Sequence, residues 1–264
     1  MAISDKSKFA FIIANITLIS VSLASYAIIH SVPDFHVLYF VYISRAYLLM
    51  FIITAITAHK KFITDRTPDS FYRLDSHAYV LSTTFFEAVT ARVLHNNFIE
   101  SHIGWSLVYF IPVSFMYEII LDFFHYWAHR GMHMNRTLYL AHKLHHTHTQ
   151  PTYINTFYFS PIDAILSSPI PTILTVYLLP CKLSLFDFIM LATYKQYTEL
   201  AGHSGKALAP SSCFPQCIWL PRILGIEGYA EDHDMHHRVS TCNFSKRFSL
   251  WDKVFGTHRR SHVS

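Results

Sequence analysis

The sequence predicts an all-α membrane protein, with several spanning helices and a helical cap that carries a cluster of histidines. Three observations predict this fold class. Hydrophobic residues make up 52% of the 264 residues and charged residues only 14%, which is too apolar for an ordinary soluble domain. Residues 9–29 hold 21 positions without a charge, enough to cross about 30 Å of hydrocarbon. Seven of the 19 histidines lie within residues 118–148.

The N-terminal part of the chain predicts a transmembrane hairpin over residues 9–58. Its first apolar run exceeds the roughly 7–15 residues of a signal-peptide core and no small-x-small cleavage site follows, so we expect an uncleaved helix. A second span is expected over 37–58, where Arg45 must pair or face other helices. Basic residues flank both open ends of this hairpin but not its turn, which places the N-terminus and residues 59–73 in the cytosol.

Four further apolar segments are less regular. Residues 79–98 contain ionisable side chains and predict an amphipathic or half-inserted helix, whereas 103–124 predicts a span that continues into the histidine-rich stretch. Residues 157–180, interrupted by prolines, and 183–201, which carry ionisable side chains, are expected to be irregular or short membrane passages. Basic residues near the histidines place every histidine motif on the cytosolic side. If the N-terminus is also cytosolic, the chain must cross the membrane an even number of times before the motifs. A hairpin formed by 79–98 and 103–124 meets this condition, and this hairpin could be re-entrant. About four spans are expected in total.

Composition narrows the remaining possibilities. The four cysteines show neither metal-type CxxC spacing nor a disulfide framework, and Pro215 separates Cys213 from Cys217, so we expect reduced thiols. The net charge of +4 comes without a patterned basic patch, which argues against binding of nucleic acid. With only 7 glycines and no repeat or linker, residues 1–264 are expected to form a single domain.

The histidines recur in three motifs with spacing suited to metal ligands. His129 and His133 are four residues apart, so on a helix their side chains lie about 5–6 Å from each other. Two HxxHH triplets follow, and they consist of His142, His145 and His146, and of His233, His236 and His237. In each triplet the adjacent pair diverges around the helix, so one triplet can serve two ions.

Counting the imidazoles predicts two metal ions. The three motifs supply eight, and His203 in GHSG is a candidate ninth. A catalytic zinc uses about three protein ligands and a structural one four, so nine nitrogens exceed the needs of one ion and suit two ions with open positions. Imidazole accepts zinc, copper, iron or nickel, so the spacing leaves the identity of the metal open.

Several neighbouring side chains could act on these histidines. The acids Asp122, Asp232 and Asp234 are candidates for fixing imidazole tautomers, with helix capping or a surface ion pair as the alternative for each. Glu199 stands four residues before His203 and could be a ligand, a partner of His203 or a helix-surface acid. His125 shares the helical stripe of the first motif and is a further candidate.

The three motifs and their flanks resemble those of the fatty acid hydroxylase/sterol desaturase superfamily of membrane proteins. The segments that carry the resemblance are DFFHYWAHRGMH, LYLAHKLHH, and DHDMHH followed by NFSKRFSLWDKVFGT. They cover about residues 118–258, the expected histidine-motif catalytic region. The resemblance implies a non-haem di-iron centre that activates O2 to hydroxylate or desaturate a lipid, with the nine histidines as ligands and catalytic residues.

The chain also departs from the pattern of this superfamily. The resemblance aligns the first motif with His129 and His133, and His125 stands where an aromatic residue is usual. The family often has His-Pro after its second motif, whereas here Ser160-Pro161 precedes Asp163. Some relatives have a histidine at the position of Glu199.

The resemblance also implies partners and a compartment. The chain has no flavin, haem or nucleotide fingerprint, so electrons must come from a separate donor, typically cytochrome b5 or a ferredoxin with its reductase in relatives. A sterol-type lipid is the favoured substrate, with sphingoid base, fatty acyl and alkylglycerol lipids as alternatives, and the endoplasmic reticulum membrane is expected in a eukaryote. A membrane zinc hydrolase and a histidine-rich metal transporter are the two other functional classes considered, although transport sites usually lie near the bilayer midplane.

Overall fold

The computed structural model describes residues 5–63, 74–99, 109–208 and 213–260. Within these ranges the chain is α-helical and contains no strand, apart from one isolated bridge between Phe62 and Lys206. The all-α class predicted from the sequence is therefore confirmed. The four cysteines are all free, as expected.

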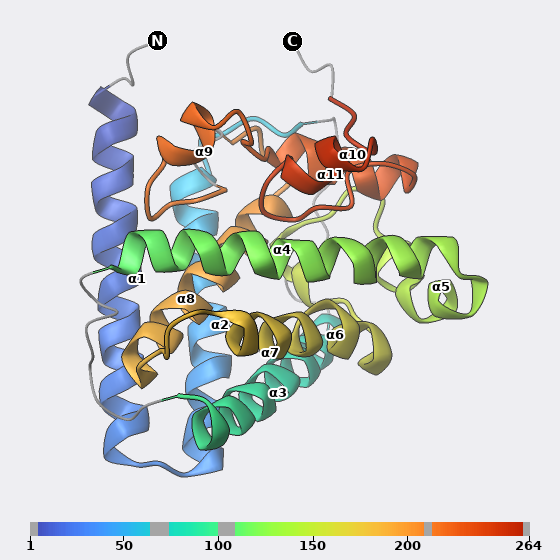
Figure 1. Ribbon diagram of the computed structural model, residues 1–264. Helices are drawn as coiled ribbons and strands as arrows, with labels where there is room; N and C mark the ends of the chain where they lie inside the picture. The colour runs from blue at the N-terminus through green and yellow to red at the C-terminus, as the bar shows by residue number, and fades with distance from the viewer. Residues whose placement is uncertain (1–4, 64–73, 100–108, 209–212, 261–264) are drawn as a thin grey trace.

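Two long apolar helices begin the chain. Helix α1 (Asp5–Ser31) and helix α2 (Phe35–Thr57) run side by side in opposite directions and are joined by a short turn (Figure 1). The turn ends at Asp34, whose side chain accepts a hydrogen bond from the backbone N–H of His36 and so caps the start of α2. Arg45 is buried and donates to Gln196 on another helix at 3.0 Å, so it faces protein as expected.

Three helices of the described residues are long and apolar enough to cross a membrane. They are Phe11–Ser31, Phe35–Thr57 and Pro161–Leu178. The first two match the predicted hairpin. The third consists of α6 (Pro161–Ser167) and α7 (Pro169–Leu178), and it is interrupted at Ser168 because a proline begins each half, as the prolines in this segment predicted.

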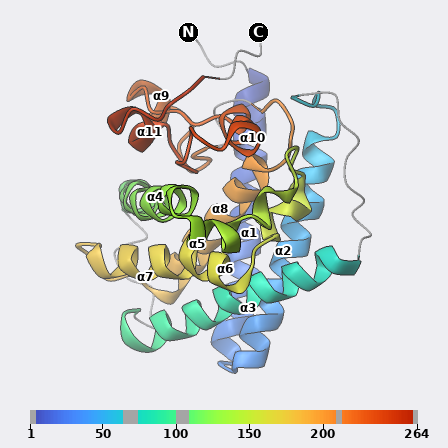
Figure 2. The same ribbon diagram turned by 90° about the vertical axis from the view of Figure 1, so that its right-hand side faces the viewer.

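The middle of the chain differs from the expected hairpin of residues 79–98 with 103–124. Residues 100–108 lie outside the described residues, and helices α3 (Leu74–Asn97) and α4 (Phe110–Met134) do not pair with each other, because α7 packs against both. Helix α4 lies roughly at right angles to the α1–α2 pair: it crosses the view in Figure 1 and is seen nearly end-on, to one side of the pair, in Figure 2. Neither α3 nor α4 is among the three candidate spans.

Helix α8 (Leu185–Gly202) corrects the expectation of an irregular passage over 183–201, because it is continuous. Ser184 and Asp187 form a capping box at its start. Lys195 does not interrupt the helix because its ammonium is buried between Glu87 at 3.2 Å and Glu199 at 3.0 Å. The sequence showed the charge of this lysine but not its partners.

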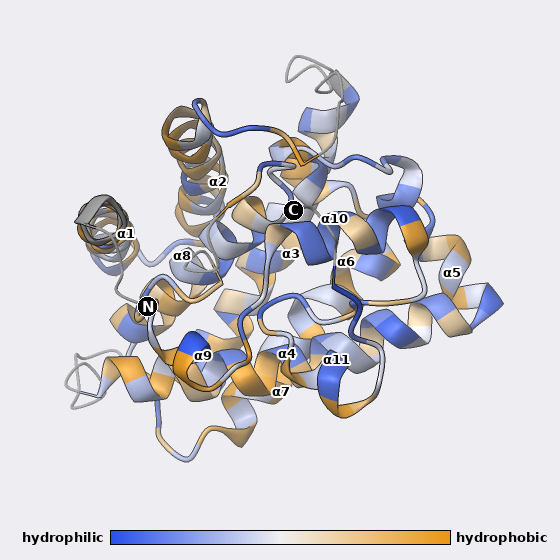
Figure 3. Cartoon of the chain, turned by 90° about the horizontal axis from the view of Figure 1, so that it is seen from above, coloured by the Kyte–Doolittle hydropathy of each residue, from blue (hydrophilic) through white to orange (hydrophobic). Residues whose placement is uncertain are grey.

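A cap of short helices completes the fold. It comprises α5 (Arg136–His142), η2 (His145–Thr147), η3 (Tyr153–Phe157), α9 (Leu220–Ile223), α10 (Ala230–Val239) and α11 (Leu250–Val254). Helices α9, α10 and α11 lie above α4, toward the N-terminal end of α1 (Figure 1). Seen from above, α10 is mainly hydrophilic, whereas α1 and α2 are rich in hydrophobic residues (Figure 3).

Candidate metal centre

The nine predicted histidines come together in two groups. The first contains His129, His133, His142, His146 and His236, and the second contains His145, His203, His233 and His237. Within each group the possible ligand nitrogens lie within 4.8 Å of one another. Each HxxHH triplet contributes to both groups, because one of its two adjacent histidines belongs to the first group and the other to the second.

Five different elements position these side chains. Helix α4 carries the first pair one turn apart, α5 ends at His142, and η2 presents the adjacent pair of the first triplet. Helix α10 carries the second triplet, and His203 is the C-terminal cap residue of α8. His133 is half-buried, and the other eight side chains are buried.

The Nε2 atoms of these imidazoles point at one another. The Nε2–Nε2 distance is 3.1 Å from His142 to His146 and 3.2 Å from His146 to His236. In the second group it is 3.0 Å from His203 to His233 and 3.2 Å from His233 to His237. Burial, reinforced by the neighbouring histidines, lowers the pKa of His133 to about 3, and burial is also the main reason that the pKa of His203 is lowered to about 3. These two imidazoles are therefore neutral at pH 7.

Neutral imidazoles at these distances cannot all be hydrogen-bonded to one another. In a neutral ring whose Nδ1–H donates, as His142 would to a carboxylate and His236 to a carbonyl, the Nε2 atom carries a lone pair. Both of these lone pairs face Nε2 of His146, which has one proton at most. At least one contact would be repulsive in the protein alone, whereas a cation at the centre would attract all the lone pairs.

Four of the nine histidines have a carbonyl or carboxylate acceptor within 3 Å of Nδ1, the ring nitrogen opposite Nε2, and Nδ1 of His146 lies 3.5 Å from the hydroxyl of Ser240. The acceptors of the Nδ1–H groups of His129, His142, His203 and His236 are, in that order, Phe244 O (2.9 Å), Asp163 Oδ2 (2.9 Å), Glu199 O (2.9 Å) and Cys242 O (2.7 Å). Such bonds fix the tautomer that leaves Nε2 free for a metal.

Asp163 was not singled out as a functional residue in the sequence. It is fully buried in the first turn of α6 and binds His142 directly. Its second carboxylate oxygen accepts from the hydroxyl of Ser167 at 2.8 Å. An available signal was the position of an aspartate at the start of an apolar segment, since a buried carboxylate needs a partner.

The predicted acidic partners act differently from the expectation. The carboxylate of Asp122 accepts the backbone N–H groups of Lys246, Arg247 and Phe248 rather than an imidazole. Glu199 contacts His203 through its backbone carbonyl, while its carboxylate forms ion pairs with Arg247 at 2.8 Å and with Lys195.

The other candidates lie at the edge of the two groups. Asp232 caps α10 by accepting the backbone N–H of Tyr229 at 3.2 Å, and Asp234 pairs with Arg238 one turn later at 3.2 Å. The ring of His125 lies beside that of His129, with centroids 5.2 Å apart and planes tilted by 52°, but His125 belongs to neither group. Capping and ion pairing, the alternatives considered for these acids, are thus contacts that Asp232 and Asp234 make.

The donor set fits transition-metal ions. Nine imidazole nitrogens suit iron, zinc, copper or nickel and do not suit calcium or magnesium, which prefer oxygen. The fold and site thus define a helical protein with spans suited to a membrane and a candidate two-metal histidine centre.

The chain belongs to the fatty acid hydroxylase family, whose sequence pattern matches residues 113–257. This confirms the resemblance of the histidine motifs and their flanks. The matched region contains both histidine groups in full.

Individual relatives come from this family and from sterol metabolism. The chain is 33% identical over 160 residues to a fatty acid hydroxylase from Lecanicillium, over 58% of this chain and 42% of the relative. It is 32% identical to a methylsterol monooxygenase from Aspergillus fumigatus, over 54% of this chain and 45% of the relative. It is 29% identical to lathosterol oxidase from Rattus norvegicus, over 59% and 47%. The match thus spans about half the length of these relatives. No solved structure matches the chain significantly.

Proposed function

We propose that this protein is a membrane-bound non-haem di-iron oxygenase that hydroxylates or desaturates a lipid, using O2 and external electrons. The observation that carries the proposal is the convergence of nine imidazoles in two groups. A hydrolytic zinc site needs about three protein ligands, and two adjacent all-histidine groups exceed that need. The family membership and the named activities of the relatives support the same chemistry.

The nine histidines would hold two iron ions, which would supply the activation of O2 needed to attack an unactivated C–H bond. The protein contributes orientation and exclusion of water. Asp163 and the carbonyls of Phe244 and Cys242 hold three imidazoles of the first group in the tautomer that presents Nε2. Burial of the centre keeps bulk solvent away from it, which limits side reactions.

A sterol-type lipid is the favoured substrate. Two of the relatives described above are named as sterol enzymes and one as a fatty acid hydroxylase, so fatty acyl, sphingoid base and alkylglycerol lipids are further candidates. We propose that electrons come from a separate carrier such as cytochrome b5, or a ferredoxin with its reductase. The compartment proposed for a eukaryotic cell is the endoplasmic reticulum membrane.

The proposed topology places both histidine groups and the N-terminus on the cytosolic side. Ile63, just after α2, donates its backbone N–H to Gly205 O at 2.9 Å, and Ala207 donates to Lys61 O at 3.1 Å. The end of α2 therefore lies beside His203. If α1 and α2 each cross once, the N-terminus is on the same side as this point, and Lys60 and Lys61 favour the cytosol. Protease protection of tags at the two ends in sealed microsomes tests this topology: both tags are expected to be digested, and protection of either contradicts it.

The activity is tested first by lipid profiling of cells with and without the protein. A lipid that gains an oxygen or loses two hydrogens is the expected change. The purified protein should then convert that lipid only with iron, a reductant and O2, and for an alcohol product the oxygen atom should come from labelled O2. Turnover without O2 would indicate the hydrolase class, and metal flux in vesicles would indicate the transporter class. Either result would overturn the proposal.

A further inference from the structure

The two histidine groups differ in how their imidazoles are held. In the first group, Nδ1 of His129, His142 and His236 has an acceptor at 2.7–2.9 Å. In the second group only His203 has one. The Nδ1 atoms of the other three members of that group are buried without a hydrogen-bond partner in the protein, and these members are His145, His233 and His237. A metal-bound histidine almost always donates its other ring N–H to a carboxylate, a carbonyl or water.

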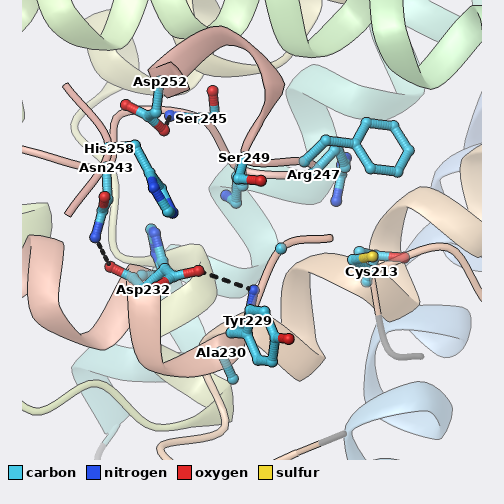
Figure 4. A pocket seen from close by; sticks show the side chains of 16 residues that line it. Cys213, Tyr229, Ala230, Asp232, Asn243, Ser245, Arg247, Ser249, Asp252 and His258 are labelled. Atoms are coloured by element: carbon cyan, nitrogen blue, oxygen red, sulfur yellow. Dashed lines mark hydrogen bonds between the residues drawn. The ribbon is translucent and has the colours of Figure 1, made fainter. Parts of the chain in front are cut away.

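His233 also lines a cavity of about 40 Å³, which is formed by α10 and residues 243–249. Figure 4 shows Ser245, Ser249, Asn243 and Asp252 around this cavity. The last two are already engaged. Asn243 binds Asp232 O and the backbone of Arg259, and both carboxylate oxygens of Asp252 accept backbone N–H groups of the same loop.

Three polar atoms at this cavity have no partner in the protein. They are the hydroxyl oxygens of Ser245 and Ser249 and Nδ1 of His233. His233 and Ser249 are more than nine-tenths buried, at 7% and 4% exposure, so bulk solvent does not satisfy them directly. A buried donor or acceptor without a partner destabilises the fold, so three around one small cavity call for a ligand.

We propose that this cavity is a binding site for ordered water, which accepts the Nδ1–H of His233 and is held by Ser245 and Ser249. A buried water needs roughly 10–15 Å³ of such space and two to four polar partners. The cavity exceeds the first requirement, and the three atoms meet the second. The volume is too small for a lipid or a nucleotide. Ser245 and Ser249 are thus positioning residues: they act on the second histidine group through water, and they do not touch the metal.

This inference rests on the proposed metal centre and deepens it. Water replaces, for His233, the carbonyl or carboxylate acceptors that orient His129 and His142. The second group is accordingly oriented through solvent, and its ion is expected to be released more readily than the ion of the first group. The two serines should control this release without affecting the first group.

The experiment measures iron per chain and its loss to a ferrous chelator, with purified protein reconstituted with ferrous iron. The Ser245→Ala/Ser249→Ala double variant is compared with the wild type and with Ser114→Ala. Ser114 is the matched control, because it is buried in α4 and donates to Ile111 O in its own helix at 2.9 Å. Loss of such an outer partner typically weakens metal binding 10–100-fold. We therefore expect one of two irons to be lost about tenfold faster from the double variant, and no change in Ser114→Ala.

Each outcome is decisive. Ser249→Val, which fills the cavity with methyl groups, should reproduce the loss of one iron, and a circular dichroism spectrum like that of the wild type shows that it folds. Two irons held equally well by the wild type and the double variant would overturn the inference and leave the proposed function intact. An experimental map without water in the cavity would also overturn it. A wild type that binds no iron would instead overturn the proposed function, and the inference with it.

Discussion

The pair of Asp163 and His142 gives the sharpest test of the metal centre. Both side chains are buried, and Asp163 Oδ2 lies 2.9 Å from His142 Nδ1. The substitution Asp163→Asn keeps the shape of the side chain but removes its charge. Hydrogen bonds to charged groups contribute about 1.5–3 kcal/mol and neutral ones about 0.5–1.5 kcal/mol, so the expected loss is about 1–1.5 kcal/mol. This corresponds to iron binding in the first group that is roughly 5–13-fold weaker.

The assay is competition for iron between the protein and a chelator of known affinity. Asp187→Asn is a matched control, because Asp187 is equally buried, stands in the first turn of α8 and follows a capping serine, as Asp163 does in α6. Asp187 binds Ser184 and takes no part in the histidine groups. Its substitution should lower stability through the cap and leave iron affinity unchanged. Equal iron affinities in the two variants would refute the orienting role of Asp163.

Three further outcomes follow from the same geometry. His145→Ala removes a nitrogen from the second group and should abolish turnover while the protein stays inserted in the membrane; retained activity would falsify its assignment as a ligand. Arg247 forms a buried ion pair with Glu118 at 2.9 Å. Arg247→Met leaves the charge of Glu118 buried without this partner and should destabilise the fold by about 3–5 kcal/mol. The measurement is the thermal midpoint, which should be lower than that of Arg247→Lys. The pKa of His133 and His203 is held at about 3 by burial, below the usual value near 6.5, so the unfolded chain binds more protons between these values. The metal-free protein should therefore lose stability as the pH falls below about 6.5, and a thermal midpoint that is constant from about pH 8 to 5 would contradict this.

The fold was predictable where a segment is uniform and less so where charges lie in apolar helices. The two N-terminal spans followed from hydropathy, since Arg45 is the only charged residue within Phe11–Ser31 and Phe35–Thr57. Residues 183–201 were expected to be irregular because of Lys195, whose acidic partners come from α3 and from one turn later in α8. Pairing with a residue more than a hundred positions away decides whether such a lysine can be buried, and no local window of sequence contains it.

The candidate site was also only partly predictable: the sequence indicates where the Nε2 side of each imidazole lies, but not what binds its Nδ1 side. The Nε2 edges converge because histidines recur at helical spacing, which is visible in the sequence. The acceptors on the Nδ1 edges of His129, His203 and His236 are backbone carbonyls. Every residue supplies a carbonyl, so no residue type marks these positions, and only Asp163 was open to prediction from its side chain.

The position of one of these carbonyls, that of Phe244, depends on Asp122, an acid that the sequence indicated for another role. Asp122 lies two helical turns before His129 on α4, and its carboxylate accepts three successive backbone N–H groups of residues 246–248. The same loop carries Phe244, whose carbonyl orients His129, and Ser245 and Ser249 at the cavity beside His233. One face of α4 therefore supplies both a histidine of the first group and the anchor for the loop that orients it. Because the anchor and the ligand share a rigid helix, a shift of the loop relative to His129 must break the bonds to Asp122. This explains how an acid can matter to the metal centre while binding no imidazole.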